Sequence, residues 1–92
     1  MHTDAFHTSL ALIDYLALLV PRIALHDAAL ARALRSSATA IPVHIAAGKP
    51  ERLAQAHQAA GRVHVMLIVA QSWAYVPADD LADAPRRLAR RA

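Results

Sequence analysis

"TAIPVHIAAGKP", residues 39–50, decides the fold, because it places a proline inside an apolar run. A strand would alternate polar and apolar residues, and this segment does not. A loop would not keep apolar residues in helical phase on both sides of Pro42, yet one face is apolar throughout: Leu30, Leu34, Ala38, Ile41 and Ile45. We therefore predict one helix, kinked near Pro42, where the missing N–H disrupts a hydrogen bond.

Local signals also predict where this helix begins and where the next one starts. Asp27 can cap the first turn by accepting a hydrogen bond from a free backbone N–H. Gly48 can adopt the left-handed conformation that ends a helix, and Pro50 suits the first turn of the following helix. That third helix is expected to run from Pro50 to about Tyr75. Its predicted core seam is Leu53, Ala56, Ala60, Val63, Leu67, Ala70 and Ala74.

The two ends of the chain predict a first and a fourth helix. The first is expected to begin after Thr3 or Asp4 and to end at Pro21. Its predicted core stripe is Phe6, Leu10, Ile13, Ala17 and Val20. The C-terminal segment, "PADDLADAPRRLARRA", has aspartates first and arginines last, the order that complements a helix dipole. It predicts a short fourth helix, interrupted by Pro85.

Composition favours a single small helical domain over residues 1–92. The chain is rich in alanine, has two glycines and is 57% hydrophobic. It has no cysteine, which excludes disulfides and thiolate metal sites and fits a reducing cytoplasm. The N-terminal "MHTDAFH" lacks the basic region of a signal peptide. The longest apolar segment contains Asp14 and falls short of the roughly 20 residues of a membrane span. We expect a soluble cytoplasmic protein with no membrane partner.

The predicted third helix has a second apolar face, opposite its core seam. A surface helix should be polar there, so a helix that is apolar on both sides is expected to be buried on both. This predicts a subunit interface and hence a homo-oligomer. The candidate interface residues are Val65, Val69, Ser72 and Val76, with Val43 of the second helix extending the patch.

Charge predicts the class of partner. The net charge is +3, and most of the charged residues between 22 and 76 are basic. A basic surface suits nucleic acid or an acidic protein, although a solvated surface gives the same signal. The candidate nucleic-acid-binding residues are Arg32, Arg35, Lys49, Arg52, Arg62, Arg86, Arg87, Arg90 and Arg91.

The histidines predict neither a metal site nor a catalytic centre. His57 and His64 are two helical turns apart, too far along the axis to share an ion, and no carboxylate lies one turn from either. "RLAQAH", from Arg52 to His57, matches the Arg-x4-His pattern of helical HEPN ribonucleases. In such a chain, rich in arginine and histidine, this match arises by chance. We predict no metal, no cofactor and no catalytic residue.

The segment "LRSSATAIPVHIAAG", residues 34–48, resembles a signature close to "LRRAAVSIPANIAEG". That signature belongs to the four-helix bundle family of proteins encoded in intervening sequences of 23S ribosomal RNA genes. The matching residues are Leu34, Arg35, Ala38, Ile41, Pro42, Ile45, Ala46 and Gly48. The departures are polar positions of the signature, where this chain has Ser36, His44 and Ala47. The likeness covers about residues 27–76. The chain is also similar to the accessory variability protein of diversity-generating retroelements, a relative of the same fold.

The resemblance implies an up-down-up-down bundle that assembles as a ring, often a pentamer. For the retroelement relatives it also implies binding to a reverse transcriptase and to nucleic acid. The expected fold is therefore an all-α four-helix bundle with its second helix kinked at Pro42 and a short fourth helix. The expected function is that of a non-enzymatic oligomeric adaptor that binds nucleic acid or a nucleic-acid enzyme. The alternatives are a metal-independent HEPN-like ribonuclease using Arg52 and His57, and a purely structural oligomer.

Overall fold

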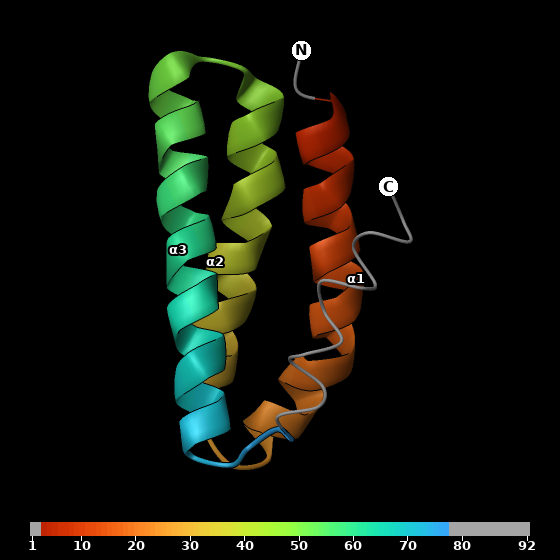
Figure 1. Cartoon of the computed structure of the whole chain (residues 1–92), viewed down its shortest axis with the longest axis vertical. Coiled ribbons are helices and arrows are strands. Elements are labelled where there is room, and N and C mark those ends of the chain that lie inside the picture. The colour runs from red at the N-terminus through yellow and green to blue at the C-terminus, as the bar shows by residue number, and fades with distance from the viewer. Residues whose placement is uncertain (1–2, 78–92) are drawn as a thin grey trace.

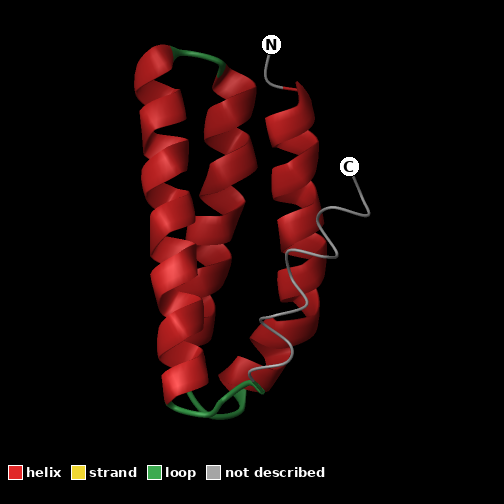
Figure 2. Cartoon of the chain, in the orientation of Figure 1, coloured by secondary structure: helices red, strands yellow, loops and turns green. Residues whose placement is uncertain are grey.

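A computed structural model describes residues 3–77, which form three consecutive helices (Figures 1 and 2). These are α1 (Thr3–Ala24), α2 (Ala28–Ala47) and α3 (Pro50–Ser72). Short connections reverse the chain direction twice, so neighbouring helices are antiparallel. Helix α2 packs extensively against both α1 and α3. The fold is therefore centred on α2.

The prediction of four helices is wrong for this structure, which contains three helices in the range 3–77. The predicted fourth helix falls on the segment that begins at Pro77, and all of that segment after Pro77 lies outside the described residues. The sequence argument relied on the order of charges in this segment. Matching a dipole stabilises an existing helix by only about 0.3–1 kcal/mol and does not by itself create one.

The predicted start, end and continuity of helix α2 are confirmed. Asp27 is the N-cap, and its Oδ1 accepts a hydrogen bond of 2.9 Å from the backbone N–H of Leu30. The helix continues through Pro42 without interruption. It ends at Gly48, whose φ of 73° is left-handed, and Pro50 occupies the first turn of α3. Each of these residues favours the backbone conformation that it adopts.

Helix α1 does not end at Pro21, contrary to the prediction, but continues to Ala24. Its ribbon bends near this end (Figure 1), where a proline removes one hydrogen bond and its ring crowds the preceding turn. By length and composition alone, Asp4–Ala24 is sufficient to cross a membrane. Only 33% of that apolar window is buried, and its buried Tyr15, Leu16, Leu19 and Ile23 join the core formed with α2 and α3.

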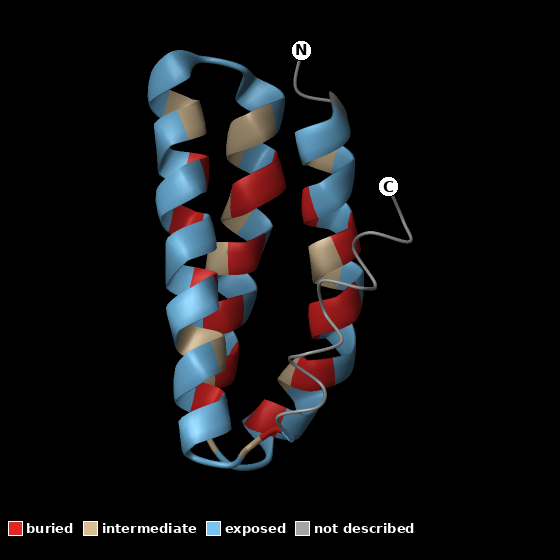
Figure 3. Ribbon diagram, viewed as in Figure 1, coloured by how far each residue is buried: buried red, intermediate tan, exposed pale blue. Residues whose placement is uncertain are grey.

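The core is a single cluster on the facing sides of the helices (Figure 3). Helix α2 contributes its predicted stripe, with Leu34 fully buried at the centre. The stripe predicted for α1 is partly wrong, since Leu10 and Ala17 are exposed, although Ile13 and Val20 pack against the core. The seam predicted for α3 is partly wrong, since Ala60 and Ala74 are exposed. The buried apolar residues of α1 are Ala11, Tyr15, Leu16, Leu19 and Ile23, and those of α3 are Ala56, Ala59, Val63 and Ala70.

The end of α3 is a Schellman motif built on an alanine. Ala74 has a φ of 60°, in the left-handed region that residues other than glycine rarely occupy. The backbone N–H of Tyr75 donates to the carbonyl of Ala70, and that of Ala74 donates to the carbonyl of Gln71, each at 2.9 Å. The turn sends Tyr75 and Val76 back against the core cluster.

The left-handed backbone conformation of Ala74 can be tested by substitution. Because glycine has no Cβ to collide with the backbone, Ala74→Gly should raise the free energy of unfolding by about 1 kcal/mol. The matched control is Ala60→Gly, an exposed position inside α3, which should lower it by about 1 kcal/mol. Chemical denaturation followed by circular dichroism measures both. Destabilisation of similar size in the two variants would contradict the left-handed turn.

Candidate nucleic-acid and subunit interfaces

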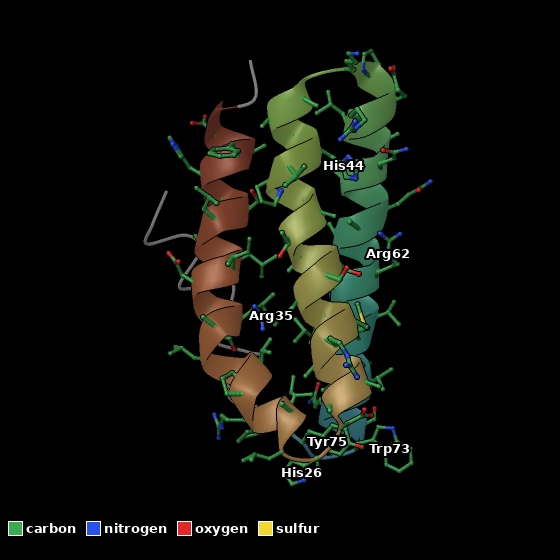
Figure 4. All side chains as sticks on the ribbon, turned by 180° about the vertical axis from the view of Figure 1, so that it is seen from behind. His26, Arg35, His44, Arg62, Trp73 and Tyr75 are labelled. Carbon is green, nitrogen blue, oxygen red and sulfur yellow. The ribbon has the colours of Figure 1, made fainter. Side chains whose placement is uncertain are left out.

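Three arginines lie on or beside the exposed side of α2. Arg32 and Arg35 belong to α2 and Arg62 belongs to α3, and we call the three together the α2 basic face. All three are exposed. Figure 4 shows Arg35 on the side of α2 toward α1 and Arg62 on the side toward α3. The Arg62 Nε lies 3.5 Å from the Ser37 Oγ, so this side chain leans from α3 toward α2. The arrangement presents guanidinium groups from two helices on one side of the molecule.

Arg35 also borders a pocket between α1 and α2. The pocket is lined mostly by apolar residues, including Ile13, Ala17 and Val20, with Thr39 as a second polar residue. The Thr39 hydroxyl donates to the backbone carbonyl of Arg35 at 2.7 Å and is therefore already engaged. The Arg35 guanidinium is the charged group at this pocket.

Arg52 is partly buried and engaged with a histidine of the neighbouring helix. Its Nε donates a hydrogen bond of 2.8 Å to the Nδ1 of His44, near the end of the molecule where α2 leads into α3. His57 is exposed, and five residues correspond to about 140° around a helix. The structure therefore does not bring Arg52 and His57 together but joins Arg52 to His44. Sequence reasoning missed this pair because its members lie on different helices.

The other predicted basic residues are dispersed. Lys49 is exposed in the two-residue connection between α2 and α3. Arg86, Arg87, Arg90 and Arg91 lie outside the described residues. In the range 3–77, no group of three or more histidine, aspartate or glutamate side chains is placed to hold a metal ion.

The side of α3 that faces away from α2 is apolar along its second half, and we call it the α3 outer face: Val65, Ile68, Val69 and Ser72. Val65 is 57% exposed. The prediction that Val76 belongs to this surface is wrong, because Val76 lies beyond the helix end, is only 2% exposed and packs in the core. Ile68 was missed, although it lies three residues from Val65 and is equally outward-facing.

Val43 is exposed on α2, but it belongs to a different side of the molecule. It follows Arg32 by eleven residues, about three helical turns, so it shares the side of α2 that carries Arg32. His44 is the next residue, about 100° around the helix, and it faces α3 through its bond to Arg52. Val43 therefore neighbours the α2 basic face.

A row of three aromatic rings, which sequence reasoning also missed, lies at the end of the molecule where α1 joins α2 (Figure 4). The rings of His26 and Tyr75 are stacked, 5.2 Å between centroids and 4° between planes. Those of Tyr75 and Trp73 are 6.4 Å apart and 15° between planes. We call His26, Tyr75 and Trp73 the aromatic row. The signal available in the sequence was "WAY" directly after an apolar helix, in a chain with only 4% aromatic residues.

Comparison of the chain with protein-family models, with curated proteins and with solved structures gave no match.

The pairing of His44 with Arg52 predicts different roles for two histidines. His44→Ala removes the acceptor from a partly buried guanidinium and should lower the free energy of unfolding by about 1 kcal/mol. His57→Ala is the matched control, because His57 is exposed and should change stability by no more than about 0.5 kcal/mol. Urea denaturation of both variants provides the comparison. Equal stability of the two proteins would show that the interhelical bond contributes nothing.

Proposed function

We propose that the protein is a non-enzymatic helical adaptor that binds nucleic acid on the α2 basic face and self-associates through the α3 outer face. The two surfaces differ in chemistry, since the α2 basic face is made of arginines and the α3 outer face is mostly apolar. Arg32 and Arg35 lie on α2, whereas Arg62 belongs to α3 and borders the outer face beside Val65. A self-associating unit with one basic surface repeats that surface once per subunit, which multiplies contacts along a polyanion.

The observation that carries the nucleic-acid proposal is the charge of α2 and α3. Between residues 28 and 72 the only carboxylate is Glu51, and the basic residues are Arg32, Arg35, Lys49, Arg52 and Arg62. Helix α2 itself contains no aspartate or glutamate. A phosphate approaching the α2 basic face therefore meets cations without a nearby competing carboxylate on that helix. Arginine suits this role because its planar guanidinium can donate two hydrogen bonds to one phosphate.

Self-association is supported by the pattern on α3. Six exposed residues follow each other at alternating spacings of four and three, the spacing of a coiled-coil seam: Ala54, Gln58, Gly61, Val65, Ile68 and Ser72. Gly61 lies inside the helix, where glycine costs about 1 kcal/mol relative to alanine. A Cβ at Gly61 would meet nothing within 4 Å in this chain. Internal packing therefore does not require a glycine, whereas close approach of a second helix would.

The family resemblance supports the same function and adds two expectations. A pentameric ring is the assembly it favours, and a reverse transcriptase is the class of nucleic-acid enzyme it suggests as a partner. The ribonuclease alternative gains no support from geometry, since it requires Arg52 and His57 to act together and Arg52 is bonded to His44.

The nucleic-acid proposal predicts binding that weakens steeply with salt, because each neutralised phosphate releases counterions. The triple variant Arg32→Gln, Arg35→Gln and Arg62→Gln should lose at least tenfold in affinity and show a shallower slope of log affinity against log salt. Arg22→Gln, on α1, controls for the loss of one positive charge elsewhere. Fluorescence anisotropy with a labelled oligonucleotide at about 50 mM salt makes the measurement. Absence of binding by the unaltered protein would refute this part of the proposal.

The self-association proposal predicts that Val65→Asp dissociates the assembly. A carboxylate at the centre of an apolar interface loses its hydration without gaining a partner. Val43→Asp makes the same change at a similarly exposed valine on α2 and should leave the assembly intact. Multi-angle light scattering reports the mass, and circular dichroism checks that the helices remain. A mass of 9.9 kDa for the unaltered protein would be that of a monomer and would disprove self-association.

A further inference from the structure

The aromatic row is held in place from both sides by backbone structure. His26 sits in the α1–α2 turn, where the N–H groups of His26 and Asp27 both donate to the carbonyl of Ile23, at 3.0 and 2.8 Å. Trp73 and Tyr75 flank the left-handed Ala74 of the Schellman motif. Because both supporting turns are closed by hydrogen bonds, the backbone that carries the three rings is fixed, and the rings also contact one another. Preorganised rings bind a ligand with little loss of side-chain entropy.

The outer members of the row are open to solvent. Tyr75 is half-buried in the middle, His26 is exposed, and Trp73 is 67% exposed. Burying Trp73 would be worth more than burying most other residues, yet the fold leaves most of it in water. The Tyr75 contact therefore accounts for only part of the Trp73 surface. The remaining surface is available to a flat apolar ligand.

The aromatic row lies at the start of the helix that carries Arg32 and Arg35, beyond the Asp27 cap. Helix α2 starts directly after His26 and Asp27, and Arg32 lies about 8 Å further along its axis. That distance corresponds to roughly two nucleotide steps at the spacing of one strand. The rest of the α2 basic face follows in the same direction along α2. A basic track that ends at stacked aromatic rings is the arrangement by which proteins bind single strands.

We propose that the aromatic row is a stacking platform for the bases of single-stranded nucleic acid, with Trp73 as the principal contact and the α2 basic face holding the phosphates. This inference rests on the proposed nucleic-acid function and specifies its substrate class. A single strand exposes the faces of its bases to an aromatic ring, whereas a duplex hides them in its own stack. Every base can stack on an aromatic ring, so the platform should prefer single strands over duplexes without preferring a sequence.

The chain contains its own probe for this proposal, because Trp73 is its only tryptophan. Tryptophan fluorescence should fall when an oligouridine of about 12 nucleotides is added at about 50 mM salt. Inorganic polyphosphate of equal charge should bind without this quenching, since it has phosphates and no bases. A blunt duplex of the same length should bind by anisotropy and quench little.

Trp73→Ala should weaken binding of the oligouridine by about tenfold or more and leave the duplex and polyphosphate affinities within twofold. Leu25→Ala is the matched control, because Leu25 is 84% exposed at the same end of the molecule and has no ring. Trp73→Phe keeps a stacking surface and should recover most of the affinity. Circular dichroism and light scattering on each variant check that helices and assembly are unchanged.

The outcomes separate this inference from the function on which it rests. Oligouridine binding without fluorescence quenching, or equal weakening of all three ligands by Trp73→Ala, overturns the stacking platform and leaves nucleic-acid binding in place. Failure of the unaltered protein to bind any of the three ligands overturns both. Dissociation of the assembly by Trp73→Ala would assign the ring to a subunit or protein contact and would also overturn the platform.

Discussion

The structure depends on α2 remaining a continuous helix through Pro42, because α2 is the helix against which both others pack. Pro42 cannot donate to the carbonyl of Ala38, so one backbone hydrogen bond is lost in the middle of the helix. Burial compensates: Ala38, Ile41 and Pro42 are all buried. A proline ring with no polar N–H is well suited to an apolar contact. The residue that weakens α2 as an isolated helix therefore contributes to its packing.

Three exposed surfaces follow from this central position of α2. Its solvent side carries arginines, the far side of α3 carries valines and an isoleucine, and the turns that follow α1 and α3 together carry the aromatic row. Helix α3 packs on α2 along its inner side and is apolar on its outer side as well. Helices α2 and α3 each have one side in the core and a chemically distinct side at the surface. Several distinct surfaces on a small frame are what the proposed adaptor function requires.

Sequence reasoning succeeded where the structure is decided locally. Asp27, Gly48 and Pro50 each adopt the conformation that their own chemistry favours, and α2 continues through Pro42 because its apolar stripe keeps its phase. Sequence reasoning failed on α1, where apolar residues occupy nearly every position and several stripes fit equally well. The stripe that is buried includes Leu16, Leu19 and Ile23, chosen by contact with α2.

The candidate site was predictable only in those parts that a single helix decides locally. The exposed arginines of α2 follow from helical phase alone. The bond between Arg52 and His44 joins two helices, and the aromatic row joins two turns, so neither is encoded in the spacing of a single element. Val76 was misassigned because helical phase was extended past Ser72, where the helix ends and the chain turns back. Ala74 offered no signal, since alanine normally favours a right-handed helix.

The packing of α1 and α3 on separate parts of α2 also affects how the molecule opens. Each outer helix contacts α2 extensively, so the loss of either one would expose a different part of α2. Partial opening then has two routes, each with its own free energy and its own set of amide protons released to exchange. The amides at the centre of α2, which both neighbours cover, should therefore exchange later than those of the outer helices. The protein thus has one central helix that both outer helices cover.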